Sequence, residues 1–291
     1  MLFFQPFGIS ALALLPALIL CIIIYAKDKV EKEPVLLLLG LFLAGAVIFV
    51  PSMFAERALL ALFDRAFSSH MDVGLYGIVK YDSLLYEILH DSLCGFVASA
   101  LIEELLKWLV LFFATNKNKN FNSFFDGIVY SVYISMGFCV AGNIAAAINS
   151  GWDTLINRFL FSLPENLFFG VLSGLFYTLW HTFRNAKQAE KAYAEENGIE
   201  IKKPFRSLQW IVLSIAAPLI MHGIYRFAEI NRTISSVNWV FYVFTVLLYV
   251  FSFIIVFRIS KEDSYETTIA QKLISKKYRS DKNGSKTENQ I

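Results

Sequence analysis

Long apolar runs constrain the fold of this chain more than any other sequence feature. They are about 20 residues long, the length of helix that crosses the hydrocarbon core of a bilayer. The runs are continuous rather than alternating, which argues against a β-barrel. Only 17% of the residues are charged, against about 25% in an average soluble domain. The sequence therefore predicts an all-α, polytopic membrane bundle and excludes an ordinary soluble globule.

Seven apolar segments are long enough to be membrane-spanning helices. The expected spans are residues 9–26, 35–54, 88–114, 124–148, 159–180, 208–227 and 239–257. The long connection 55–87 is partly amphipathic and is expected to lie at the membrane interface on the outer side. Residues 1–260 are expected to form one membrane domain. Residues 261–291 are expected to form a polar cytoplasmic tail that is disordered at its end.

Basic residues are concentrated in alternate connections between these spans. The first, third and fifth connections and the C-terminal tail hold most of the 26 Lys and Arg residues. Cytoplasmic segments carry an excess of these residues, so the N-terminus is expected outside and the C-terminus in the cytoplasm. The chain has no basic face that would indicate a nucleic-acid partner.

Charged side chains inside the expected spans are the main functional signal, because a charge within a bilayer is costly and usually functional. The third span contains Glu103, Glu104 and Lys107. Glu103 and Lys107 are four residues apart on one helical face, in the favourable order, whereas Glu104 is rotated by about 100°. Lys107 is expected to hold one glutamate and leave the other free to act as a general base towards water.

Other polar residues recur in the later spans. His222 and Arg226 are four residues apart in the sixth span, and a buried histidine can act as an acid, an oxyanion stabiliser or a metal ligand. Asp126 lies at the expected N-terminus of the fourth span, where a carboxylate is favoured, and Asn143 can bond across helices. The alternative interpretation is structural: these groups could lock the helices together without performing chemistry.

Three motifs occur in a fixed order along the spans. They are Glu103-Glu104-x-x-Lys107, the Phe-Asp-Gly-Ile-Val-Tyr string at 125–130, and His222-Gly-Ile-Tyr. Over residues 33–227 the chain resembles the PrsW family of intramembrane proteases, which is related to the CAAX-prenyl endopeptidases. The resemblance implies a multi-pass peptidase of the bacterial inner membrane that acts on a membrane-anchored protein. One glutamate would activate water, while histidines and other polar groups stabilise the oxyanion or hold a metal such as zinc.

Three positions depart from the family pattern. Gly142 stands where the family typically has glutamate, Asn166 where it has histidine, and Arg226 where it has aspartate. The remaining set makes a poor metal site, because a catalytic zinc usually has three His or carboxylate ligands, so the cofactor stays open. Arg226 could also reach a glutamate and keep it occupied, and Glu165 offers a substitute carboxylate.

Three hypotheses follow from these residues. The first is an active endopeptidase in which Glu104 is the base, Glu103 its partner and His222 supports the transition state. The second is a catalytically impaired relative that binds membrane segments without cutting them. The third, an ion- or proton-coupled transporter, is the least favoured by the ordered motifs. Supporting roles fall to Lys107, Asn143, Asn166, Asp126 and Arg226.

Overall fold

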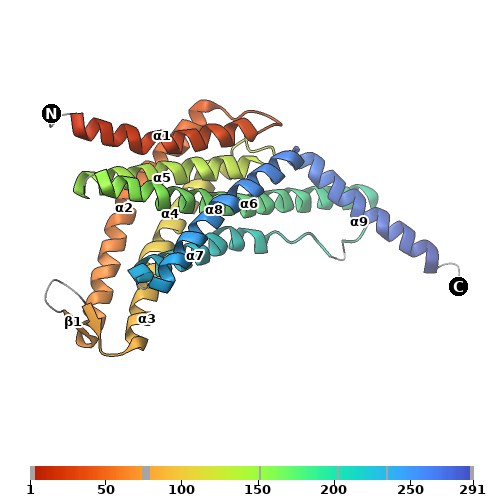
Figure 1. Ribbon diagram of the computed structural model, residues 1–291. Coiled ribbons are helices and arrows are strands. Elements are labelled where there is room, and N and C mark those ends of the chain that lie inside the picture. Colours follow the sequence, from red (N-terminus) through yellow and green to blue (C-terminus); the bar gives the residue numbers. More distant parts are fainter. Residues whose placement is uncertain (1–3, 74–78, 151, 202, 234, 289–291) are drawn as a thin grey trace.

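The computed structural model describes residues 4–73, 79–150, 152–201, 203–233 and 235–288, and these are almost entirely helical (Figure 1). The helices are α1 (Phe4–Lys27), α2 (Val35–Phe67), α3 (Leu84–Ser92), α4 (Ile102–Thr115), α5 (Asp126–Ser150), α6 (Trp152–Asn197), α7 (Leu208–Ile230), α8 (Ser235–Glu262) and α9 (Glu266–Glu288). A π-helical segment, η3 (Leu93–Leu101), joins α3 to α4, and single 3-10 turns follow α2 (η1, Ser68–His70) and α7 (η4, Asn231–Thr233). The strands β1 (Met71–Val73) and β2 (Val79–Tyr81) pair antiparallel, with Asp72 opposite Lys80.

Five helical segments of the described chain have the length and hydropathy to cross a membrane. They are Val35–His70, Asp126–Ile148, Leu160–Asn197, Leu208–Ile230 and Asn238–Glu262. The apolar stretch Leu14–Lys27 of α1 is shorter than these five segments. The predicted all-α membrane fold is confirmed at this level, while the count of seven spans and the orientation of the termini stay predictions.

The helices α5 and α6 lie at the centre of the bundle and carry much of its buried core. Glycines let the backbones of α5 and its neighbours approach closely. A Cβ atom at Gly137 would overlap the carbonyl oxygen of Phe42 on α2, and one at Gly174 would overlap the carbonyl oxygen of Gly127. Small residues are common where helices pack within membranes, so these contacts fix α2 and α6 against α5.

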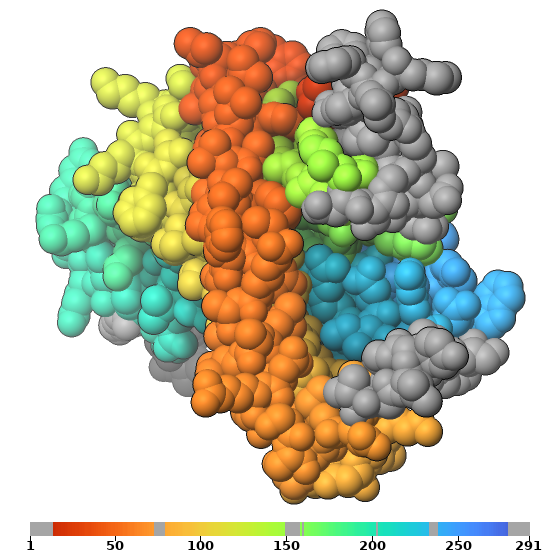
Figure 2. Space-filling view, turned by 90° about the vertical axis from the view of Figure 1, so that its left-hand side faces the viewer, coloured from red at the N-terminus to blue at the C-terminus, as the bar shows by residue number. Residues whose placement is uncertain are grey.

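The helix α2 is longer than the sequence analysis expected. The predicted span ended at residue 54, but α2 continues through Pro51 to Phe67. The residues after Pro51 are mostly strong helix formers such as Ala, Leu, Glu and Arg, which explains why the helix does not end there. Figure 2 shows α2 as one continuous ridge from the top to the bottom of this face. The extension brings Glu56 and Arg57 to the wall of the cavity described below.

The helix α6 is also continuous, since it runs from the fifth expected span through Pro164 and onward to Asn197. Most of the predicted polar tail, residues 261–291, forms α9, which packs against α6. Glu266 accepts hydrogen bonds from Asn185 Nδ2 at 2.7 Å and Thr182 Oγ1 at 3.1 Å, and its Oε2 lies 2.7 Å from His181 Nδ1. The tail is helical to Glu288, and its last residues, 289–291, lie outside the described part of the chain.

Candidate active site

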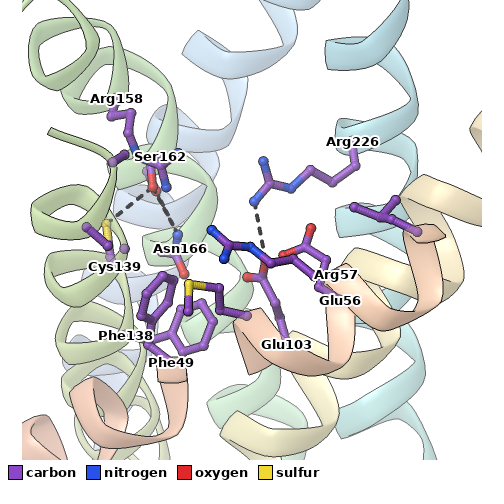
Figure 3. Close-up of a pocket in the computed structure, with 15 residues that line it drawn as sticks. Phe49, Glu56, Arg57, Glu103, Phe138, Cys139, Arg158, Ser162, Asn166 and Arg226 are labelled. Atoms are coloured by element: carbon purple, nitrogen blue, oxygen red, sulfur yellow. Dashed lines mark hydrogen bonds and ion pairs between the residues drawn. The ribbon is translucent and has the colours of Figure 1, made fainter. Parts of the chain in front are cut away.

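A polar cavity of about 330 Å³ lies among α2, α4, α5, α6 and α7 (Figure 3). In that view Glu103 comes from α4 and Arg226 from α7, and Glu56 and Arg57 of α2 lie beside them. An adjoining cavity of about 200 Å³ shares Arg158, Ser162 and Arg226 with the first. The lining residues of the larger cavity are Phe49, Met53, Glu56, Arg57, Leu60, Glu103, Phe138, Cys139, Gly142, Ala145, Ala146, Arg158, Ser162, Asn166 and Arg226.

The two glutamates of the third span lie at the point where η3 changes into α4. A π-helical segment has wider turns than an α-helix and is frequent at functional sites. Glu103 and Glu104 occupy the first turn of α4 and are both buried, with exposed fractions of 5% and 3%. Because they are adjacent in a helix, they point in directions about 100° apart and acquire different partners.

Glu104 is held by two basic or polar side chains. Lys107 Nζ donates to Glu104 Oε1 at 2.6 Å, and His222 Nδ1 lies 2.8 Å from the same oxygen. Lys107 therefore holds one glutamate, as expected, and that glutamate is Glu104 rather than Glu103, which is four residues away. Spacings of three and four residues both bring helical side chains together, so spacing alone does not select the partner. Lys107 Nζ also donates to Asn166 Oδ1 at 3.4 Å.

Glu103 lines the cavity and has a different set of partners. Its Oε1 accepts hydrogen bonds from Ser99 Oγ and from Arg226 Nη2, each at 3.3 Å. Arg226 Nη2 also lies 3.7 Å from Glu165 Oε1, and its Nη1 donates to Glu229 Oε2 at 2.8 Å. The expectation that Arg226 reaches a glutamate is confirmed, and its guanidinium serves three carboxylates.

His222 connects the two glutamates through Arg226. Its Nδ1 faces Glu104, while Arg226 Nε lies 3.2 Å from His222 Nε2. A guanidinium only donates, so Nε2 is the acceptor in this contact and Nδ1 is the nitrogen that faces the carboxylate of Glu104. The ring also stacks on Phe169, with centroids 4.7 Å apart. One chain of hydrogen bonds thus links Lys107, Glu104, His222, Arg226 and Glu103.

All three positions that depart from the family pattern, Gly142, Asn166 and Arg226, line this same cavity. Gly142 lies on its wall, where a Cβ atom would be 3.4 Å from Arg158 Nη2. Asn166 donates to the main-chain oxygen of Ser162 at 2.9 Å, and Figure 3 shows it beside Ser162. Asn143 is joined to this wall because Arg158 Nε donates to its Oδ1 at 2.9 Å. The structure therefore brings these sequence-predicted residues together.

Asp126 is the one predicted supporting residue that lies elsewhere. It begins α5, and its Oδ2 accepts the main-chain N–H groups of Asn122 and Ser123, each at 2.7 Å. The predicted position at a helix N-terminus is confirmed. Gly142 is 16 residues further along the same helix, or about 24 Å at 1.5 Å per residue. Asp126 thus takes no part in this cavity.

Several residues of the cavity were not found by the sequence analysis. The apolar pattern places Glu56 and Arg57 in an outer connection and Arg158 between two spans. A signal was present in α2, since Phe49, Met53, Glu56 and Leu60 have the spacing of one helical face and all line the cavity. That face becomes visible only once the helix is known to continue past residue 54.

The donor groups at this site do not fit a catalytic metal ion. A catalytic zinc site needs three converging ligands and an open position. Within the described residues, one cluster brings the ligand atoms of three His, Cys, Asp or Glu side chains within 4.8 Å of one another. The residues of that cluster lie outside this cavity. Both nitrogens of His222 are also engaged, and Glu104 Oε1 is bonded to Lys107.

A helical membrane bundle with ionisable groups around an interior polar cavity is typical of proteins that perform chemistry within the bilayer. The sequence profile described as "PrsW family intramembrane metalloprotease" matches residues 33–256. The chain belongs to the PrsW family. That description names a metal, and the donor groups of this cavity do not fit a metal site.

Curated relatives support the same assignment. Protease PrsW of Oceanobacillus iheyensis is 29% identical over 243 residues, which cover 84% of this chain and 92% of the relative. Protease PrsW of Bacillus subtilis is 26% identical and covers 85% and 92% of the two chains. Protease PrsW of Clostridioides difficile is 27% identical and covers 74% and 76%. No solved structure matches the chain.

Proposed function

We propose that this chain is an endopeptidase of a bacterial inner membrane that cleaves a membrane-anchored protein, with the attacking water in the cavity beside Glu103. The observation that carries the proposal is the position of Glu103, a buried carboxylate that lines the cavity and is not paired with Lys107. The names of the curated relatives support proteolysis as the reaction class.

Glu103 is the general base in this mechanism, in place of Glu104. Glu103 takes a proton from water, the water oxygen bonds to the carbonyl carbon of the scissile peptide, and negative charge develops on the carbonyl oxygen. The carbon–nitrogen bond then breaks, and Glu103 returns its proton to the departing amine. A carboxylate that accepts a proton and returns it accounts for both proton transfers of peptide hydrolysis.

Arg226 stabilises the oxyanion. In the resting arrangement the charge of Glu103 holds the guanidinium at 3.3 Å. Protonation of Glu103 removes that charge, so Arg226 is released to the carbonyl oxygen at the moment when negative charge develops there. His222 and Glu229 keep the rest of the guanidinium in place, and a preorganised donor aimed at a developing oxyanion contributes about 2.7–4 kcal/mol.

Glu104, His222 and Lys107 are positioning residues in this mechanism. None of the three lines the cavity, yet His222 Nε2 accepts from Arg226 Nε, and Glu104 fixes the opposite side of the ring. Their removal would let Arg226 turn away from the cavity while Glu103 keeps its place. Membrane lipid is the only other partner that this mechanism requires.

A second candidate is the catalytically impaired relative, which keeps the cavity for binding alone. The observation that favours it is again Arg226, because its ion pairs with Glu103, Glu165 and Glu229 neutralise the carboxylates that would activate water. Under this alternative the substitutions at Gly142 and Asn166 have removed groups that the reaction needs.

A cleavage assay separates the two candidates. Purified chain in lipid vesicles would be tested on single-span substrates chosen because Protease PrsW of Oceanobacillus iheyensis cuts them. We expect cleavage, and a loss of about 10²–10⁴-fold in rate for Glu103→Gln, the usual range for a general base. Glu195→Gln, which removes an exposed charge, is the matched control.

Other outcomes identify the alternatives. No cleavage by the native chain, with activity gained by the Gly142→Glu, Asn166→His double variant, would show an impaired relative. Full activity of Glu103→Gln with loss of activity in Glu104→Gln would return the base to Glu104. A proton-coupled flux across the vesicle membrane, lost in Glu103→Gln, would support a transporter instead.

A further inference from the structure

A second group of acidic residues lies at the junction of three segments far from the cavity. The segments are the α1–α2 connection at residues 28–34, the start of α5, and the α8–α9 connection at residues 263–265. Main-chain bonds join the last two segments, since Phe124 N donates to Ser264 O at 3.1 Å and Glu266 N donates to Asn122 O at 2.9 Å. Asn122 Nδ2 donates to Glu31 Oε2 at 3.0 Å and so links the first connection to them. Figure 1 shows the end of α1 and the joint of α8 and α9 along the same side of the molecule.

The group consists of three residues. Asp28 begins the α1–α2 connection, Glu33 lies near its end, and Asp126 is the first residue of α5. Their exposed fractions are 0%, 4% and 0%, and ligand oxygens of all three lie within 4.8 Å of one another. Asp263 adds a fourth carboxylate at the edge of the group and accepts the N–H of Phe125 at 3.1 Å. Like charges at this separation repel one another strongly when water is excluded.

Asp126 accepts hydrogen bonds from Asn122 and Ser123, but Asp28 and Glu33 lack partners that would offset their burial. Within the described part of the chain, both carboxylate oxygens of Asp28 and Oε2 of Glu33 are without a hydrogen-bond partner. The nearby ammonium group of Lys32 donates to the main-chain oxygens of Tyr25 and Asp28 rather than to a carboxylate oxygen. Buried charges in proteins are paired or coordinate metals, so the free oxygens of Asp28 indicate a missing positive partner.

Burial also disfavours the charged form of these groups. Desolvation raises the pKa of Asp28 to about 6 and the pKa of Glu33 above its usual range. A cation would remove the same penalty, because it replaces the lost water with direct coordination.

We propose that Asp28, Glu33 and Asp126 bind one hard divalent cation of the Ca²⁺ or Mg²⁺ class. The donors are oxygen atoms only, which suit Ca²⁺, Mg²⁺ and Mn²⁺, whereas zinc sites usually contain His or Cys. Water would complete the coordination, since three carboxylates supply fewer ligands than these ions need. The cation fastens the α1–α2 connection to α5 beside the α8–α9 joint. This site is independent of the proposed proteolysis.

Terbium luminescence tests the proposal on the full-length chain in phosphatidylcholine nanodiscs after treatment with a chelator. Tb³⁺ replaces Ca²⁺ at oxygen sites, and Tyr130, which adjoins Glu33, would sensitise its emission. We expect saturation at one ion for each chain, displacement by Ca²⁺ or Mg²⁺, and a thermal midpoint that rises when Ca²⁺ or Mg²⁺ is added. Asp28→Asn should weaken binding about tenfold or more, in line with other disrupted metal sites.

Matched variants identify the site that binds the ion. Glu31→Gln removes an exposed carboxylate from the same connection and should bind Tb³⁺ as the native chain does. Glu103→Gln should also bind normally, which separates this site from the cavity. If Asp28→Asn does not fold, Glu33→Gln takes its place. The proposal is overturned if the native chain shows no divalent-dependent midpoint, or if both acidic-group variants bind Tb³⁺ as tightly as the native chain.

Discussion

At the scale of single residues, the partners of Lys107 decide how the site works. The ammonium group is 5% exposed and lies between Glu104 and Asn166. A buried ion pair adds little net stability, but removing one member leaves an uncompensated charge in the interior. Lys107 therefore couples the fold to the site, because it fixes Glu104, which in turn fixes His222.

Glu104→Gln is expected to destabilise the protein by about 3–5 kcal/mol, since Lys107 then lacks a counter-charge. The double variant Glu104→Gln, Lys107→Met should be less destabilised than the sum of its two single variants. Thermal or denaturant unfolding in nanodiscs measures this coupling. Additive losses would contradict the pairing of Lys107 with Glu104.

At the scale of elements, the contact between α2 and α5 controls the shape of the cavity. Gly137 allows the α5 backbone to touch the main chain of α2 at Phe42. The same two helices then supply Phe49, Glu56 and Phe138 to the cavity wall. A change in their separation therefore acts on the site from a distance along the helices.

Gly137→Ala is expected to destabilise the protein by about 1–3 kcal/mol, because the new methyl group meets backbone that has no rotamer to change. Gly40→Ala is the matched control on α2, since nothing lies within 4 Å of its added Cβ atom. Unfolding midpoints of the two variants give the comparison. Equal midpoints would show that the α2–α5 contact is looser than described.

The elements also show which parts of the site were predictable. Glu103, Glu104, His222 and Arg226 stand out in the sequence because charge is rare in apolar helices. Glu56 does not stand out in the sequence, because Pro51 and the charged residues after it could belong to a connection as well as to a helix. Which of the two glutamates pairs with Lys107 depends on His222 and Asn166 from other helices. The spacing of residues within one helix therefore does not predict the pair.

At the scale of the whole molecule, α9 joins the C-terminal segment to the membrane bundle. Glu266 at its start contacts His181, Thr182 and Asn185 on α6. The composition of these residues predicts a polar tail. It does not predict how the tail docks, because the contacting residues are more than 80 positions apart in sequence. The polar half of α6 and the start of the tail thus form one unit outside the apolar core.

Glu266→Ala is expected to weaken the docking of α9 by about 2 kcal/mol, the scale of hydrogen bonds to a charged group. Trypsin should then cut at Lys272 and Lys276 at least about tenfold faster, since 1.4 kcal/mol corresponds to a factor of ten. Glu262→Ala removes an exposed carboxylate just before α9 and serves as the control. Unchanged cleavage would mean that other contacts hold α9 in place.

The guanidinium shared by Glu103, Glu165 and Glu229 has a consequence for how this chain can evolve. Arg226→Asp, which introduces the residue that the resemblance implies at this position, would gather four carboxylates around the two adjoining cavities and remove the cation between them. That intermediate is unfavourable, because several like charges in a poorly solvated site repel one another. A replacement of Arg226 by an acidic residue is therefore expected to be tolerated only together with changes at Glu103, Glu165 or Glu229.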